Sequence, residues 1–292
     1  MTDRPEDFPL DPTWADVHYG PHERQCVDFF EAEGETPRPV VVFIHGGGWN
    51  AFDKARGRPQ FPQYLDAGIS VAAINYRYAR HAREAGLQIA CEWPLHDAAL
   101  AIQFIRSKAD EWNIDRTRFG AFGGSAGGCT SLWLAFHPDM ADPLSEDPVA
   151  RESTRLCCAA ALDGQTTMDP LQVTEWMPAK SGWGAHGFGF WDNETKFAEW
   201  LAHRDELVPY IEKYSPAALV GPDAPPVYLN YPKRGLEPMP DEKGWVGHCP
   251  WYGVRLKELM DAKGLTCHLQ HKDAPNPDFP DHHAFLIHYL NA

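Results

Sequence analysis

The residues best suited to chemistry are a serine and the two glycines that flank it. Gly123, Ser125 and Gly127 form a Gly-x-Ser-x-Gly pattern inside the glycine-rich stretch 119–128. This spacing is typical of a strand that ends in a sharp turn and continues at once as a helix, with the serine hydroxyl exposed on the turn. A Cβ atom at either glycine would crowd the strand and the helix. We therefore predict that Ser125 is a nucleophile; the alternative is an ordinary glycine-rich loop.

A second glycine-rich segment could stabilise a developing negative charge. The apolar run at residues 40–44 predicts a buried strand, and the segment His-Gly-Gly-Gly-Trp at residues 45–49 follows it directly. Glycines allow backbone N–H groups to turn toward a substrate carbonyl oxygen without obstruction from side chains. We expect the amides of Gly47, Gly48 and Ala126 to form an oxyanion hole.

Together, the HGGGW segment and the GGSAGG segment at residues 123–128 resemble the α/β-hydrolase fold. Within that fold they resemble the esterases that carry HGGG and GxSAGG, which include compact carboxylesterases, carbohydrate acetyl- and feruloyl-esterases and the hormone-sensitive-lipase-like group. The resemblance covers the chain from about residue 24 onward. It implies a mainly parallel central sheet with helices on both faces, a serine esterase that forms an acyl-enzyme, and no cofactor.

A serine nucleophile needs a histidine base, which a carboxylate orients. In the resembled esterases the histidine follows the last strand. There the segment Asp-His-His-Ala-Phe at residues 281–285 resembles the family's His-Gly-Phe. The resemblance implies His283 as the base and His282 as the runner-up.

The carboxylate of the triad stays open, because the family's Gly-x-x-Asp after the penultimate strand is absent here. The loop after that strand offers Glu237, which is nearest the strand end, then Asp241 and Glu242. Asp163, which follows the preceding strand, is a further possibility.

Strand and helix patterns alternate along the chain and predict a single α/β domain over residues 1–292. Strands are expected at 24–30, 40–44, 69–76, 118–122, 156–162, 225–230 and 265–271. Residues 1–20 are expected to form an irregular arm. Residues 165–208 interrupt the alternation and contain four tryptophans. A segment of this length is typical of a cap or lid over a site, although a plain surface insertion would look the same.

The amino-acid composition limits which binding partners and which cellular compartment are expected for this protein. The net charge of −15 argues against nucleic acid and anionic membranes, and it would mildly disfavour strongly anionic substrates. The first residues lack the apolar core of a secretory signal, and seven cysteines without metal-like spacing fit the cytoplasm. No metal site is expected, and a homodimer is left open.

The sequence thus predicts a serine carboxylic ester hydrolase that acts on small-molecule esters with short acyl or aryl groups. Two alternatives remain. An arylformamidase-type amide hydrolase would share the fold and the loop chemistry. A non-catalytic ligand-binding protein would explain the missing Gly-x-x-Asp.

Overall fold

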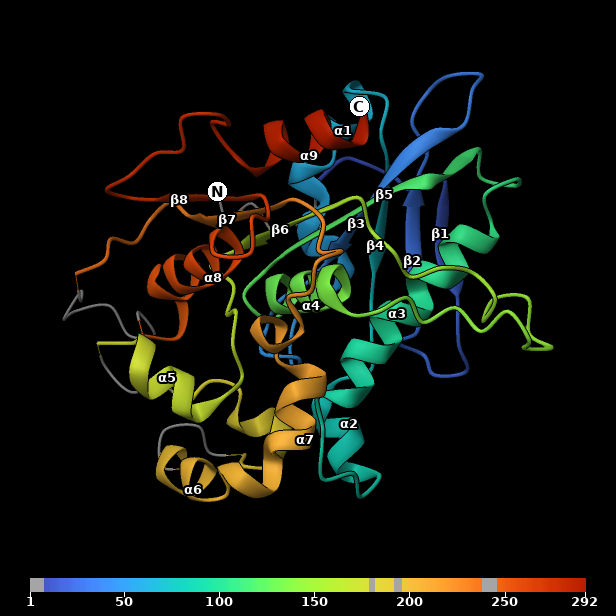
Figure 1. Ribbon diagram of the computed structural model, residues 1–292. Helices are drawn as coiled ribbons and strands as arrows, with labels where there is room; N and C mark the ends of the chain where they lie inside the picture. Colours follow the sequence, from blue (N-terminus) through green and yellow to red (C-terminus); the bar gives the residue numbers. More distant parts are fainter. Residues whose placement is uncertain (1–7, 179–181, 192–195, 238–245) are drawn as a thin grey trace.

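The computed structural model describes residues 8–178, 182–191, 196–237 and 246–292. Within these ranges, eight strands form one sheet in the order β1-β2-β4-β3-β5-β6-β7-β8. Strands β1 and β2 and strands β2 and β4 pair antiparallel, and all the other neighbours pair parallel. The predicted mainly parallel sheet is therefore confirmed (Figure 1). The strands are β1 Trp14–His18, β2 Cys26–Phe30, β3 Arg38–Ile44, β4 Ser70–Ile74, β5 Ile114–Gly124, β6 Cys158–Leu162, β7 Val227–Tyr231 and β8 Cys267–His271.

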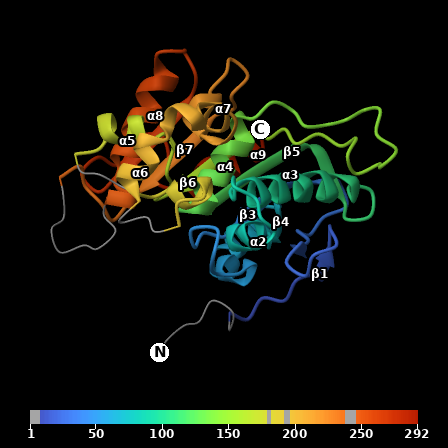
Figure 2. The ribbon, with the colours of Figure 1, turned by 90° about the horizontal axis from the view of Figure 1, so that it is seen from below.

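Helices cover both faces of this sheet (Figures 1 and 2). Helices α3, α4 and α8 pack on one face, and α1 and α9 pack together on the other. The α-helices are α1 Pro62–Asp66, α2 Ala79–Glu84, α3 Glu92–Ser107, α4 Ala126–Phe136, α5 Pro170–Trp176, α6 Phe197–Ala202, α7 Arg204–Tyr214, α8 Trp251–Asp261 and α9 His282–Leu290. Short 3-10 helices are η2 Lys54–Gln60, η3 Ala185–Phe188, η4 Pro216–Leu219 and η5 Val246–His248.

Side chains of strand β3 contribute to the apolar core on both faces of the sheet. Its side chains alternate between two apolar clusters, with Val40, Val42 and Ile44 in one and Val41 and Phe43 in the other. Successive side chains on a strand point to opposite faces, so a continuous apolar run is buried on both sides. The run at 40–44 was the sequence basis for predicting this strand, and the structure confirms it.

The parallel register brings three chemically important loops to one edge of the sheet. Ile44 at the end of β3 pairs with Gly123, and Gly124 pairs with Leu162 at the end of β6. The residues that follow these strand ends therefore emerge side by side at their carboxyl ends, where open α/β sheets bind ligands. Ser125 and Asp163 both lie there.

The structure adds elements that the sequence patterns did not predict. Residues 14–18, expected in an irregular arm, form the edge strand β1. Helix α2 at residues 79–84 was also not predicted. The insertion at 165–208 contains α5, η3, α6 and part of α7, which lie together at the lower part of Figure 1. Its role as a cap stays a prediction. In the part of the chain described, no helix has both the length and the apolar character needed to cross a bilayer.

Candidate active site

Ser125 lies on a strained turn between β5 and α4. Its backbone has φ 55° and ψ −121°, in a region that non-glycine residues rarely adopt. A Cβ atom on Gly123 would lie 2.2 Å from the carbonyl oxygen of Ile44, and one on Gly127 would lie 2.0 Å from that same oxygen. Both glycines therefore permit the close approach of the turn to β3, as the Gly-x-Ser-x-Gly spacing predicts. The turn holds the serine hydroxyl clear of the strand and the helix.

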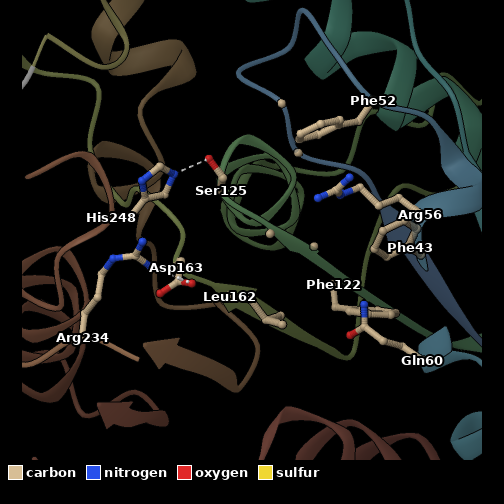
Figure 3. A pocket seen from close by; sticks show the side chains of 14 residues that line it. Phe43, Phe52, Arg56, Gln60, Phe122, Ser125, Leu162, Asp163, Arg234 and His248 are labelled. Carbon is tan, nitrogen blue, oxygen red and sulfur yellow. Dashed lines mark hydrogen bonds and ion pairs between the residues drawn. The ribbon is translucent and has the colours of Figure 1, made fainter. Parts of the chain in front are cut away.

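The serine opens into a cavity of about 330 Å³ at the carboxyl ends of the strands (Figure 3). This volume lies at the lower end of the range for small-molecule sites. Loops after β3, β5 and β6, helix η2 and the segment after β7 line the cavity. The lining residues among those described are Phe43, Gly46, Gly47, Phe52, Arg56, Gln60, Phe122, Gly123, Gly124, Ser125, Leu162, Asp163, Arg234 and His248.

His248 is the histidine that meets the serine. Its Nε2 atom lies 2.9 Å from the Oγ atom of Ser125 (Figure 3). The serine hydroxyl can donate to Nε2 when the other ring nitrogen carries the proton, and this is the tautomer a general base requires. The two residues are 123 positions apart in sequence, so only the tertiary fold brings them together.

Residues at and just after the start of the 165–208 insertion hold the His248 segment in place. The side-chain amide of Gln165 donates to the carbonyl oxygen of Gly247. The Sγ atom of Cys249 lies 3.3 Å from the Sδ atom of Met177. The insertion therefore contacts the residues on both sides of His248 in sequence.

Asp163 is the one carboxylate among the described residues that line the cavity. Its Oδ2 atom lies 3.1 Å from Nη1 of Arg234, and its Oδ1 atom is buried and accepts no hydrogen bond from a described residue. Burial raises the pKa of Asp163, while the nearby charges of Arg234 and His248 lower it in part. Asp163 is a further possibility for the acid from the sequence, and it lies in the same cavity as Ser125 and His248.

The glycine loop after β3 lies against the nucleophile. A Cβ atom on Gly46 would lie 3.5 Å from Cβ of Ser125. Gly47 lines the cavity with φ 88°. Gly48 is not among the described lining residues, and its carbonyl oxygen contacts Nε2 of His186 at 2.9 Å. Ala126 is buried as the first residue of α4, directly after Ser125. The assignment of the three amides to an oxyanion hole stays a prediction.

The structure does not bring His283 to Ser125. His283 is buried near the start of α9, its ring centroid 5.1 Å from that of Tyr64 and 6.5 Å from that of Phe122, and it is not among the described lining residues. The runner-up His282 is buried beside it, and its Nε2 lies 3.3 Å from Oε1 of Gln60. Both rings belong to the packing between α9 and the sheet, and burial lowers the pKa of each. His248 takes the place beside Ser125 that the resemblance implied for His283.

Of the other predicted carboxylates, Glu237 alone lies within the described residues. Glu237 is exposed and is not among the described lining residues. Asp241 and Glu242 lie outside the described residues. Within the described ranges, no group of three His, Cys, Asp or Glu side chains is arranged to hold a metal ion.

The side chains of His248, Arg234 and Arg56 line this cavity but were not predicted as site residues from the sequence. The sequence around His248 has no regular pattern, and nothing in it distinguishes this histidine from the other thirteen. Nothing in the sequence distinguishes Arg56 from its basic neighbours Lys54 and Arg58.

Comparison with known proteins identifies the family of this chain and finds esterases among its relatives. The sequence model of the family described as BD-FAE matches residues 28–233, well over half of the chain. Gut esterase 1 from Caenorhabditis elegans is 27% identical over 158 residues, which are 46% of this chain and 28% of that protein. Probable carboxylic ester hydrolase LipM from Mycobacterium tuberculosis is 25% identical over 221 residues, 71% of this chain and 44% of the relative. The chain thus spans less than half the length of these curated relatives.

Solved structures share the architecture at low sequence identity. A truncated carbohydrate esterase from gut microbiota has a TM-score of 0.71 and 19% identity, with 97% of this chain and 100% of the other covered. Esterase 2 of Thermogutta terrifontis, phosphonylated by sarin, has a TM-score of 0.63 and 19% identity, with 97% and 94% covered. With the sheet order described above, these likenesses confirm the predicted α/β-hydrolase fold.

Proposed function

This chain belongs to the BD-FAE family, and on that premise we propose that it is a serine hydrolase of carboxylic esters in which His248 activates Ser125. The observation that carries the proposal is the 2.9 Å contact between Ser125 Oγ and His248 Nε2 inside a cavity. A serine hydroxyl is a weak nucleophile unless an adjacent base takes its proton. The names of the curated relatives, which are esterases, support the same reaction class.

The reaction proceeds in two halves. The Oγ atom of Ser125 attacks the ester carbonyl carbon as its proton passes to Nε2 of His248. The tetrahedral intermediate then collapses, the bond to the alcohol oxygen breaks, and the imidazolium gives its proton to the departing alcohol. In the second half, water attacks the acyl carbon as His248 takes its proton. The imidazolium then gives that proton to Oγ of Ser125 as the acyl–oxygen bond breaks, which releases the acid and the free serine.

The amides of Gly47 and Ala126, with Gly48 beside them, hold the oxyanion of both intermediates. The helix that starts at Ala126 adds its positive N-terminal end to this stabilisation. The loss of one such donor typically costs about 3 kcal/mol of transition-state stabilisation.

Asp163 stabilises the protonated form of His248 through its negative charge. Arg234 fixes the carboxylate by an ion pair, which partly offsets the rise that burial causes in the pKa of Asp163. This arrangement uses an acid after β6, whereas the sequence resemblance implied an acid after β7.

The substrates are esters with short acyl groups, because the cavity is small and its walls include Phe43, Phe122 and Leu162. The arylformamidase alternative differs in the leaving group. Rates on N-formylkynurenine and on short-chain p-nitrophenyl esters separate an amidase from an esterase.

Labelling with a fluorophosphonate, combined with p-nitrophenyl butyrate hydrolysis, tests the proposal. Wild type should be labelled and active, and Ser125→Ala should lose both. Ser131→Ala is a matched control, since Ser131 lies on the same helix and donates to the carbonyl of Gly127 at 2.8 Å. A folded wild-type protein that is neither labelled nor active would favour the non-catalytic alternative.

We further propose that the protein works in a reducing compartment such as the cytoplasm. All seven cysteines lie in described ranges and are free thiols. Cysteine thiols stay reduced in the cytosol, where disulfides are rare. Fractionation of the native source, with thiol labelling before and after lysis, tests this location.

A further inference from the structure

The wall of the cavity opposite His248 carries a guanidinium group that faces the open space. Figure 3 shows His248 on one side of Ser125 and Arg56 on the other, with the guanidinium nitrogens directed toward the middle of the cavity. Arg56 belongs to η2, which follows the glycine loop. It makes no ion pair or side-chain hydrogen bond with any residue in the described ranges.

The neighbouring basic residues on η2 have partners of their own. Lys54 Nζ lies 2.6 Å from Asp16 and 3.2 Å from Asp28, and Arg58 lies 3.6 Å from Asp28. The chain has 41 acidic and 26 basic residues, so carboxylates are plentiful. The contrast singles out Arg56 as the basic residue of η2 that is turned toward the cavity instead of toward Asp28.

The segment just before Arg56 contacts its side chain and anchors the start of η2. The guanidinium carbon lies 4.0 Å from the ring centroid of Phe52, a cation–π contact. Phe52 has φ 75°, and its carbonyl oxygen accepts hydrogen bonds from Tyr78 at 2.5 Å and Arg24 at 3.2 Å. Asp53 then caps η2 through the amide of Ala55. Because these contacts already restrict the Arg56 side chain, it loses less conformational entropy when it binds a ligand.

The charges of the cavity favour an anion. Its described lining residues carry two guanidinium groups and one carboxylate, and the carboxylate of Asp163 is already paired with Arg234. The described lining residues therefore carry a net positive charge in a chain of net charge −15, and they favour an anionic group despite that net charge. Arginine binds carboxylates through two parallel N–H···O bonds, which makes it suited to a planar acid group.

The reaction geometry decides which half of the ester Arg56 faces. In the proposed mechanism His248 gives its proton to the departing alcohol, so the alcohol lies on the side of His248. The acyl group then extends to the opposite wall, toward Arg56. We propose that the acyl half of the substrate carries a second, ionised carboxylate that Arg56 binds, so that the preferred substrates are half-esters of short dicarboxylic acids. This inference rests on the proposed esterase function and adds the substrate class.

A matched pair of esters tests it. Ethyl hydrogen succinate carries the free carboxylate, and ethyl succinamate is its uncharged counterpart of the same shape. We expect wild type to favour the anionic ester in kcat/KM, measured from ethanol release, by roughly tenfold to a hundredfold. In Arg56→Met that ratio should fall to about one, and in Arg56→Glu below one, whereas Arg56→Lys should keep part of it. Arg58→Met is the control on the same helix and should keep the wild-type ratio.

Two further measurements keep the test decisive. Added NaCl should reduce the wild-type ratio, since screening weakens a charge–charge contact without any mutation. Ser125→Ala should bind ethyl hydrogen succinate more tightly than ethyl succinamate in calorimetry, and Ser125→Ala/Arg56→Met should bind them alike. Equal rates on both esters in wild type would overturn the Arg56 inference and leave the esterase function intact. Binding that depends on Arg56 without any turnover would overturn the esterase function and keep the anion site.

Discussion

The side chain of Gln165 donates a hydrogen bond to the carbonyl oxygen of Gly247, the residue immediately before His248. Gln165 is fully buried and follows β6 by three residues. The start of the insertion is thereby tied to the histidine that contacts the nucleophile. This contact makes Gln165 a positioning residue for the site.

We expect Gln165→Ala to lower kcat/KM on p-nitrophenyl butyrate by roughly tenfold or more. The substitution leaves the partly buried Gly247 carbonyl without its donor, a loss worth about 1 kcal/mol, and frees the segment that carries His248. The rate of inactivation by a fluorophosphonate should fall in parallel, because it reports how well His248 activates Ser125. Gln172→Ala is the matched control, since Gln172 contacts Thr167 in the same insertion. An unchanged inactivation rate in Gln165→Ala would show that the contact does not position His248.

The glycines around Ser125 differ sharply in how much space they have. We expect Gly123→Ala to destabilise the fold by about 3 kcal/mol or more, because its Cβ would lie 2.2 Å from the Ile44 carbonyl oxygen. Gly124→Ala is the control, since the nearest atom to its Cβ would lie 3.8 Å away, on Leu162. Urea unfolding of both variants measures the difference. Equal stabilities would contradict the close approach of the turn to β3.

Asp163→Asn should reduce kcat strongly while changing KM less. The imidazolium that forms on His248 during the reaction would lose a nearby negative charge, so kcat on p-nitrophenyl butyrate should fall. Removal of the acid in serine hydrolases costs up to about 10⁴-fold in kcat. Glu237→Gln should behave as wild type, since Glu237 is exposed away from the lining residues. If Glu237→Gln lost activity and Asp163→Asn did not, the acid would have to be reassigned.

The stability of the fold should decline as the pH falls below about 6.5. Burial lowers the pKa of His282 to about 3 and that of His45 to about 4. Between these values and 6.5 the unfolded chain binds a proton that the folded chain does not, so stability is present above 6.5 and is lost as the pH falls. Each histidine contributes a slope of about 1.4 kcal/mol per pH unit in that window. Urea unfolding at pH 7.5, 6 and 5 should show a shallower decline for His282→Gln than for wild type, and parallel curves would contradict this.

Local patterns predicted those parts of the molecule that depend on local geometry. The apolar run of β3 and the glycines that flank Ser125 encode their own conformations, and both were found where expected. The base could not be found this way, because the contact between Ser125 and His248 joins residues from separate loops. The motif around His283 pointed to α9, yet that histidine is packed against Tyr64 and Phe122. Arg56 could not be singled out from the sequence either, since only the structure shows that it makes no ion pair with a described carboxylate, unlike Lys54 and Arg58.

We propose that His248, and not His283, activates Ser125. The most direct test of this proposal compares kcat/KM of His248→Ala and His283→Ala on p-nitrophenyl butyrate, with folding checked by circular dichroism. We expect a loss on the order of 10⁴-fold for His248→Ala, and for folded His283→Ala a change of less than about tenfold. The reverse result, an inactive but folded His283→Ala beside an active His248→Ala, would contradict it.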